Sequence, residues 1–339
     1  MRTRQVYFED KNVVSLREAD LKIRPNEVLV KTHMSSICGT DKNHLLGFLP
    51  NATRVDAYHR DCYSTEAPYP RPVGHEGAGT IVEVGSAVDR FKVGDKVMSF
   101  GGYITMSDYF VAPVEPRGHS VLKVPEGLSM DEASLGEPTA CAVYAGMESG
   151  VMLGDTVLVA GAGFAGQAIA QVVRHLGAAK VIVSDIVPGK LALAKKLGAD
   201  LTVNALDTDV VGVVLDETHG KGADVVIEVA GTQEAVQTCT DAVKHGGIMG
   251  LYSWVLHPVN LVIDRWHNDG LDIRTLAVMH RIRHDMEWYQ LKALSNVVNG
   301  KVDIKSLMTH EFPLSKAKEA FDCAINDPTA CKVMLRSHT

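Results

Sequence analysis

The chain has 339 residues and a mass of 36.6 kDa, a length that favours two domains because single hydrophobic cores rarely grow so large. Hydrophobic residues make up 46% and charged residues 22%, which excludes a disordered or low-complexity chain. The net charge of −7 argues against a broad nucleic-acid-binding surface, since such surfaces need clustered Lys and Arg. No apolar run reaches membrane-spanning length and the first residues lack a signal-peptide core. We therefore expect a cytoplasmic protein without membrane or nucleic-acid partners.

Cysteine usage points to a reducing compartment. The six cysteines form no CxxC pair and no disulfide framework, and they stand at positions 38, 62, 141, 239, 323 and 331.

Up to about residue 145 the sequence is typical of a compact β-rich unit. Short apolar runs alternate with Gly and Pro, which predicts strands within residues 26–34, 79–85, 95–100 and 107–114. A polar, aromatic-rich stretch from about Gly47 to Arg71 interrupts them. Irregular segments of that length are usually lids or binding segments.

From Asp155 onward strands alternate with helices. Near-continuous apolar strands are predicted at about 156–160, 180–185, 201–204, 223–231 and 248–253, with helices following the first two and at 232–247. This alternation indicates a parallel sheet covered on both faces. The tail predicts a helix at 312–325 and a strand at 332–337. That strand has no obvious place in the second unit, so we expect it to return to the first.

A Gly-rich loop connects the first strand of this region to its helix. It reads Gly161-Ala162-Gly163-Phe164-Ala165-Gly166, between a strand and a helix, which is the context that a dinucleotide-binding loop requires. The first Gly permits a tight turn, the second lets the pyrophosphate approach the backbone, and the third allows close helix packing. The alternatives are a tight turn without a ligand and a methyltransferase, which also uses a Gly-rich first loop.

Asp185 ends the next strand, 19 residues after Gly166. A carboxylate there accepts hydrogen bonds from the adenosine ribose and repels a 2′-phosphate, and the next residues, Ile186, Val187 and Pro188, include no Arg. The sequence therefore predicts NAD rather than NADP.

Four side chains of the first unit are candidate metal ligands. Cys38 follows a predicted strand, His75 and Glu76 lie between glycines, and Glu137 precedes a Pro that fits the first turn of a helix. A thiolate, an imidazole and a carboxylate with an open fourth position suit a catalytic zinc ion. Each residue alone would be a buried hydrophobe or a solvated acid.

Residues 74–88 (GHEGAGTIVEVGSAV) resemble the signature of the zinc-containing medium-chain alcohol dehydrogenases. The stretches at 38–41, 93–97 and 136–138 and the Gly161–Gly166 loop match the same family in the same order, and the resemblance extends from about residue 5 to 336. It implies a GroES-like β-rich catalytic domain, residues 1–143 and 287–339, and a Rossmann doubly wound domain at 144–286. It also implies an active site in the cleft between them.

The resemblance assigns roles to particular residues. Cys38 and His75 would bind one catalytic zinc ion per chain, and Glu137 stands where the sorbitol- and threonine-dehydrogenase-like branches place a carboxylate ligand. Glu76 would be either an exchanging ligand or a carboxylate behind the ligands. Thr40 would hydrogen-bond the substrate hydroxyl and begin a proton relay.

Two departures from the family pattern stand out. No Cys lies between Asp95 and Ser134, so we expect no structural zinc lobe. The family commonly has a His five residues after the first ligand Cys, where it completes the proton relay. In this sequence that position is Asn43, and His44 follows it. His44 is then either a relay residue or a surface residue near a substrate loop.

Other residues have less specific interpretations. His59 and Cys62 could form a second metal site but fit a plain loop pair better, and His280 and His284 fit surface positions. We predict packing roles for Cys239, Cys323 and Cys331. Trp254 either approaches the nicotinamide or packs in the core.

The sequence thus predicts a homodimeric or homotetrameric NAD-dependent zinc dehydrogenase that transfers hydride from a secondary alcohol, namely a polyol, sugar or amino alcohol. The alternatives are a zinc-free NADPH-dependent reductase of enones or quinones in the same superfamily, and a non-catalytic protein with a dehydrogenase fold.

Overall fold

The computed structural model describes residues 1–47, 69–99, 104–114, 121–255, 258–276 and 286–338. The chain forms two compact units. Unit 1 comprises residues 1–138, 283–298 and 304–339, and unit 2 comprises 139–282 and 299–303. The boundary at 138/139 falls in the first turn of a helix, five residues before the predicted boundary.

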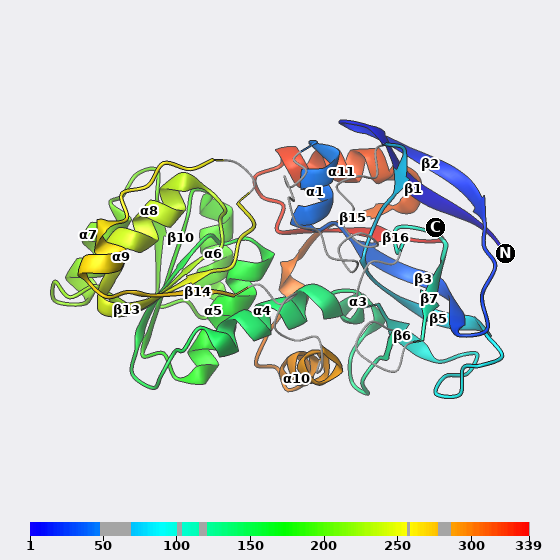
Figure 1. The fold of residues 1–339 in the computed structure, drawn as a ribbon, viewed down its shortest axis with the longest axis horizontal. Helices are drawn as coiled ribbons and strands as arrows, with labels where there is room; N and C mark the ends of the chain where they lie inside the picture. The colour runs from blue at the N-terminus through cyan, green and yellow to red at the C-terminus, as the bar shows by residue number, and fades with distance from the viewer. Residues whose placement is uncertain (48–68, 100–103, 115–120, 256–257, 277–285, 339) are drawn as a thin grey trace. The chain divides into compact units, whose positions relative to one another are not determined.

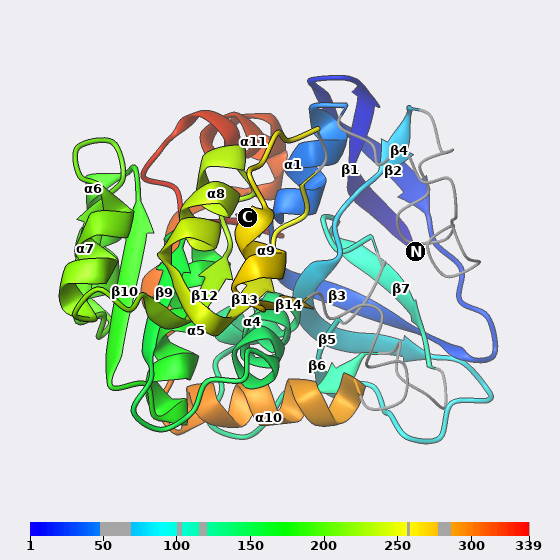
Figure 2. The ribbon, with the colours of Figure 1, turned by 60° about the vertical axis from the view of Figure 1, so that its left-hand side comes forward.

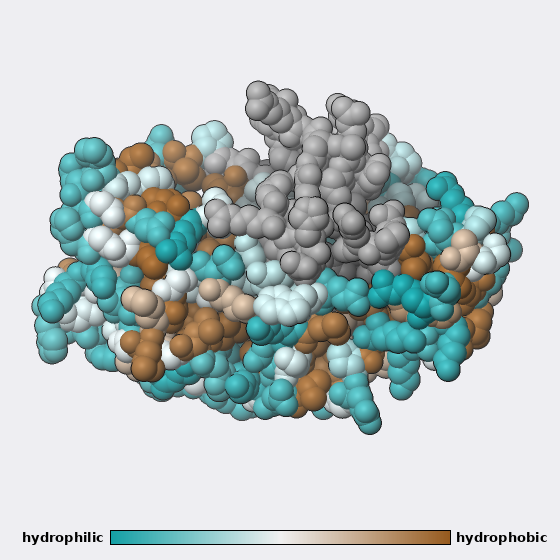
Figure 3. Space-filling model, turned by 60° about the horizontal axis from the view of Figure 1, so that its bottom comes forward, coloured by the Kyte–Doolittle hydropathy of each residue, from teal (hydrophilic) through white to brown (hydrophobic). Residues whose placement is uncertain are grey.

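Among the described residues, no helix is both long and apolar enough to cross a bilayer. Hydrophilic and hydrophobic residues alternate in small patches over the face drawn in Figure 3.

Unit 1 contains two sheets. The smaller has the order β2–β1–β4, and the larger has the order β15–β16–β3–β5–β6–β8, with β7 also pairing with β3. The strands are β1 (Arg2–Asp10), β2 (Val13–Asp20), β3 (Glu27–Ser36), β4 (Arg71–Pro72), β5 (Glu76–Val84), β6 (Lys96–Met98), β7 (Tyr109–Pro113), β8 (Leu122–Lys123), β15 (Met308–Pro313) and β16 (Lys332–Arg336). The α-helices lying wholly in this unit are α1 (Gly39–Leu45), α3 (Met130–Ala133), α10 (Met286–Val298) and α11 (Ala317–Asn326).

The chain's last strand completes the first unit, as predicted. β16 pairs antiparallel with β3, and β15 pairs parallel with β16. Figure 1 shows this red strand beside the blue β3. Strand β3 is therefore central, and its residue Ser36 lies opposite Glu76 on one side and Met334 on the other.

Unit 2 is built on a six-stranded parallel sheet of order β11–β10–β9–β12–β13–β14. Its strands are β9 (Thr156–Ala160), β10 (Lys180–Asp185), β11 (Leu201–Asn204), β12 (Ala223–Glu228), β13 (Val243–Leu251) and β14 (Asp272–Thr275). Its helices are α5 (Phe164–Leu176), α6 (Pro188–Lys196), α7 (Val210–Glu217), α8 (Gln233–Ala242) and α9 (Asp264–Asn268), while α4 (Gly136–Glu148) spans the boundary with unit 1. This order, starting from a strand–Gly loop–helix unit, is the doubly wound Rossmann arrangement.

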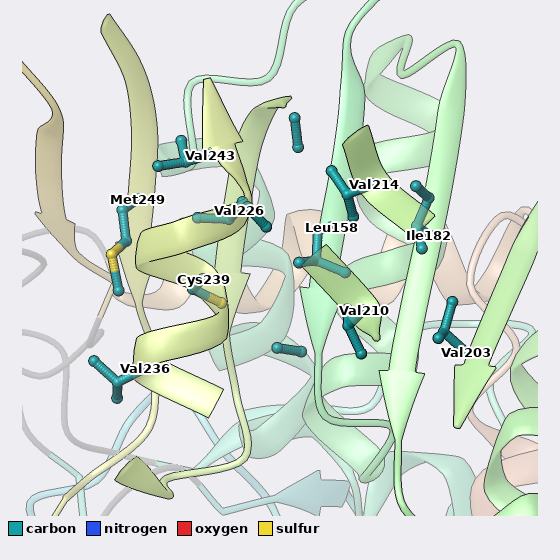
Figure 4. Close-up of a cluster of buried hydrophobic side chains, with 13 residues drawn as sticks. Leu158, Ile182, Val203, Val210, Val214, Val226, Val236, Cys239, Val243 and Met249 are labelled. Atoms are coloured by element: carbon teal, nitrogen blue, oxygen red, sulfur yellow. The ribbon is translucent and has the colours of Figure 1, made fainter. Parts of the chain in front are cut away.

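Burial on both faces of this sheet explains its apolar strands. Four of the five residues of β9 are buried, and β12 is buried to a similar extent. On one face, Leu158 and Ile182 pack against Val210 and Val214 of α7 and against Val236 of α8, as Figure 4 shows. Figure 2 shows the helices flanking the strands.

Several predicted elements differ from the structure. The helix predicted at 232–247 ends at Ala242, and Val243 already has extended backbone and begins β13. Gly246 has φ +65°, which no α-helix contains, so the helix could not run to residue 247. The helix predicted at 312–325 begins only at Ala317, because Phe312 and Pro313 belong to β15. The hairpin of β1 and β2 was not predicted, because its charged residues break up the apolar pattern.

Candidate active site

Three of the predicted metal ligands meet in unit 1. One donor atom each of Cys38, His75 and Glu76 lies within 4.8 Å of the others. Cys38 is the N-cap residue of α1, just after β3, while His75 and Glu76 stand at the start of β5. Since β3 and β5 are paired neighbours, the sheet register brings the three residues together.

Asp41 holds the first two residues in place. Its Oδ2 accepts a hydrogen bond from the Cys38 amide at 2.9 Å, and its Oδ1 lies 3.4 Å from Nδ1 of His75. Burial favours a raised pKa for the Asp41 carboxyl, but His75 and the Cys38 amide outweigh it, so this pKa is lowered. A carboxylate on one ring nitrogen leaves the other nitrogen to bind a metal ion, which is how metal-binding histidines are usually oriented.

Glu76 is completely buried, and its two carboxylate oxygens differ. Oε2 accepts hydrogen bonds from Ser36 and from Lys332, whose Nζ lies 2.6 Å away. Oε1 has no hydrogen-bond partner among the described residues. A buried carboxylate oxygen without a partner is costly unless a cation binds it. The Glu76 carboxylate, grouped with Cys38 and His75, therefore fits a zinc ion.

Lys332 is a member of the site that the sequence analysis missed. Burial disfavours its ammonium group, but the Glu76 carboxylate and the neighbouring Cys38 and Glu137 side chains raise the pKa of Lys332 above its ordinary value. The ammonium therefore stays charged in the core. No local motif marks Lys332, since it reaches Glu76 only after β16 returns to β3.

Glu137 lies near this group but is not part of it. The side chain is buried in the first turn of α4, and its carboxylate acts on Lys332. It is absent from the set of donor atoms that lie within 4.8 Å of one another. Among the predicted ligands, the structure therefore favours Glu76 over Glu137 as the carboxylate closest to the Cys38–His75 pair.

Thr40 and His44 occupy the first and last turns of α1. The Thr40 hydroxyl lies 3.8 Å from Sγ of Cys38. His44 is buried, with 4% of its surface exposed, so the surface position considered for it is wrong. Burial first, and then the charge of Arg71, lower the pKa of His44 to about 4. His44 is therefore a neutral imidazole at physiological pH.

The Gly-rich loop of unit 2 has the geometry that nucleotide binding requires. Gly161 has φ +117°, which favours glycine. A Cβ at Gly166 would lie 1.8 Å from the Gly161 carbonyl oxygen, so only glycine lets α5 pack this closely. A Cβ at Gly163, the N-cap of α5, would meet nothing within 4 Å. This open space at a helix N-terminus fits a pyrophosphate.

Asp185 stands at the end of β10, beside this loop. Its Oδ2 accepts a hydrogen bond from the Ala162 amide at 2.7 Å, and its Oδ1 accepts one from the Val187 amide at 2.9 Å. The carboxylate therefore fixes the loop and has lone pairs left for a ligand. Phe164 and Ala165 form the first turn of α5.

The remaining predicted residues separate into three groups. Cys239 is buried in the core of unit 2, and Cys323 packs against a core cluster of unit 1, as predicted, while Cys331 is half-buried. Trp254 is 45% exposed, so core packing does not describe it. His59, Cys62, His280, His284 and most of the 47–71 insertion lie outside the described residues.

Sequence and structure comparisons identify relatives of this chain. Residues 24–126 match the alcohol dehydrogenase GroES-like domain, and residues 165–296 match the zinc-binding dehydrogenase family. The chain is 30% identical to the L-threonine 3-dehydrogenase of Chelativorans sp. (strain BNC1) over 93% of its own length and 92% of the relative. The chain belongs to the zinc-dependent medium-chain alcohol dehydrogenase family. It is accordingly an oxidoreductase, and membership supports zinc and a nicotinamide nucleotide as its cofactors in general.

Other family members align over nearly the whole chain. The sorbitol dehydrogenase of Rattus norvegicus is 31% identical over 93% of this chain and 90% of its own. The 2R,3R-butanediol dehydrogenase of Bacillus subtilis superposes with a TM-score of 0.83 at 24% identity and covers 98% of this chain and 99% of its own, which supports the fold.

Proposed function

We propose that the protein oxidises a secondary alcohol, a polyol, sugar or amino alcohol, with NAD as hydride acceptor and one catalytic zinc ion per chain. The observation that supports this most is the group formed by Cys38, His75 and the buried Glu76 carboxylate, one oxygen of which has no hydrogen-bond partner among the described residues. Similarity to relatives named L-threonine 3-dehydrogenase and sorbitol dehydrogenase supports the substrate class.

Zinc would be held by Cys38, His75 and Glu76, with Glu137 close by. Bound there, zinc would act as a Lewis acid that lowers the pKa of a substrate hydroxyl, while the nicotinamide supplies the hydride chemistry. Asp41 keeps the His75 ring in position, and Lys332 with Ser36 holds Oε2 of Glu76. This leaves Oε1 as the Glu76 oxygen without a hydrogen-bond partner among the described residues.

The Thr40 hydroxyl relays the substrate proton: its oxygen accepts that proton while its own hydrogen passes outward. It lies beside Cys38, it donates and accepts, and it sits at the start of the short helix that ends near His44. His44 lies in the last turn of that helix, and its pKa of about 4 means that the imidazole releases a proton at once at physiological pH, so we place it at the outer end of the relay as a carrier that does not retain the proton.

The Gly161–Gly166 loop and Asp185 hold the nucleotide. The open N-terminus of α5 binds the pyrophosphate, and the charge of Asp185 disfavours a 2′-phosphate, which supports NAD over NADP.

A screen of polyols, sugars and amino alcohols with NAD and with NADP tests this proposal. We expect NADH absorbance with at least one secondary alcohol and a higher kcat/KM with NAD. Reduction of enones or quinones by a zinc-free preparation with NADPH would instead support the alternative reductase. The predicted homodimer or homotetramer stays a prediction, which sedimentation measurements would check.

A further inference from the structure

Unit 1 contains a second cluster of metal-ligating side chains. It consists of His310 on β15, Cys323 on α11 and Asp327, the residue that ends α11. One donor atom from each lies within 4.8 Å of the others. None of the three belongs to the group around Cys38, and all are half-buried, so solvent and ions can reach them. The proposed dehydrogenase function does not use them.

The Asp327 carboxylate is held with one oxygen toward His310. Its Oδ1 accepts hydrogen bonds from the Thr329 amide at 2.8 Å and from the Thr329 hydroxyl at 2.6 Å. Its Oδ2 lies 3.4 Å from Nε2 of His310. Metal-binding carboxylates are commonly fixed by such hydrogen bonds.

Thr309 lies beside the other ring nitrogen of His310. Its hydroxyl is 3.0 Å from Nδ1 of His310 and 3.3 Å from the Lys332 carbonyl oxygen, and it accepts a hydrogen bond from the Cys331 amide. When Nδ1 carries the proton and donates it to this hydroxyl, the lone pair of Nε2 faces the Asp327 carboxylate, and a cation between them can bind both.

The separation of these two atoms leaves room for a metal ion. Nε2 of His310 and Oδ2 of Asp327 stand 3.4 Å apart. Nitrogen and oxygen ligands of a tetrahedral zinc ion, each about 2.0–2.1 Å from the metal, stand about 3.3–3.4 Å apart. The observed distance matches the edge of such a tetrahedron.

Cys323 completes a ligand set that prefers zinc. A metal ion displaces the thiol proton on binding. One sulfur, one imidazole nitrogen and one carboxylate oxygen form a borderline-soft set that suits Zn²⁺ rather than Mg²⁺ or Ca²⁺.

We propose that His310, Cys323 and Asp327 bind a second zinc-class ion, distinct from the catalytic one, with water as the fourth ligand. The ion clamps β15 to the end of α11. Because β15 pairs with β16, this clamp also supports the strand on which Lys332 lies.

Metal content of purified, tag-free chain tests the proposal. We expect about two zinc ions per chain in the wild type, and about one in Asp327→Asn, whose amide oxygen keeps the Thr329 hydrogen bonds. Asp322→Asn is the matched control, because Asp322 lies on the same helix but pairs with Lys318, and it should keep about two. An Asp327→Asn chain with as much zinc as the control would overturn the site.

A second measurement separates this site from the catalytic one. Cys38→Ser should retain about one cobalt ion with a thiolate-to-cobalt charge-transfer band, and the Cys38→Ser/Cys323→Ser chain should lose both ion and band. A Cys38→Ser chain that binds no cobalt contradicts the second site even if the dehydrogenase proposal holds. If Cys38→Ser does not fold, the same band compared between wild type and Cys323→Ser, where it should fall by about half, gives the answer.

Discussion

Glu76 and Lys332 form a buried ion pair that lies against the candidate zinc ligands. The Lys332 ammonium lies 2.6 Å from the Glu76 carboxylate, and both side chains are almost fully buried. Removing one charge of such a pair leaves the other uncompensated in a low-dielectric interior, whereas removing both costs far less. The ion pair therefore holds the Glu76 carboxylate in place, and each of the two buried charges is stable only while the other is present.

This dependence is measurable in zinc-depleted protein. We expect Lys332→Met to lower the free energy of unfolding in urea by about 3–5 kcal/mol, and Glu76→Gln/Lys332→Met to recover most of that loss. Lys318→Met is the control, since it removes an exposed ion pair and should leave stability unchanged. Equal stability of Lys332→Met and wild type would show that the pair does not stabilise Glu76.

His44 makes stability depend on pH. Its pKa is about 4 in the folded chain and about 6.5 when unfolded, so the unfolded state binds more protons between these values. Stability is therefore fully present above pH 6.5 and is lost as the pH falls toward 4. We expect the His44 contribution to fall by about 2 kcal/mol from pH 7 to pH 5. Urea unfolding of wild type and His44→Gln at both pH values checks this, and parallel pH profiles would refute it.

We propose that Asp185 selects the nucleotide by charge. Asp185→Asn keeps an oxygen for one backbone amide but removes the negative charge that repels a 2′-phosphate. We expect the preference for NAD over NADP, expressed as the ratio of kcat/KM values, to fall about tenfold or more. An unchanged ratio would mean that other residues choose between the two nucleotides.

At the scale of elements, Gly163 and Gly166 at the start of α5 differ in what surrounds them. A Cβ at Gly166 would clash with the Gly161 carbonyl, whereas a Cβ at Gly163 would occupy open space. Packing therefore requires glycine at position 166 but not at position 163. We propose that Gly163 is needed for the nucleotide that fits the helix N-terminus.

Alanine substitutions distinguish the two reasons. We expect Gly166→Ala to lower the free energy of unfolding by about 2 kcal/mol or more, because backbone must shift. Gly163→Ala should change stability by less than about 0.5 kcal/mol, yet weaken NAD binding about tenfold or more. Chemical unfolding and calorimetric titration with NAD measure both. A Gly163→Ala chain that binds NAD normally would mean that the nucleotide does not approach this loop.

At the scale of the whole molecule, local sequence patterns predicted the strands and helices well, but they predicted few of the contacts between segments that are distant in the sequence. The strand–loop–helix unit at Gly161 is a local signal, and so is the apolar, two-face-buried strand β12. Cys38 and His75 could be paired because each lies in a motif. Lys332 could not, since its partner Glu76 becomes its neighbour only through sheet pairing. Likewise His310 and Cys323 come together through the packing of α11, which no short pattern encodes.

The most direct test of the central proposal follows NADH formation while zinc is titrated into metal-free chain. With a secondary alcohol that the wild type accepts, the initial rate should rise in step with zinc bound, and Cys38→Ser should stay at least about 10³-fold slower at the same zinc concentration. A wild type whose rate is independent of zinc, or a Cys38→Ser chain that turns over like wild type, would contradict the account.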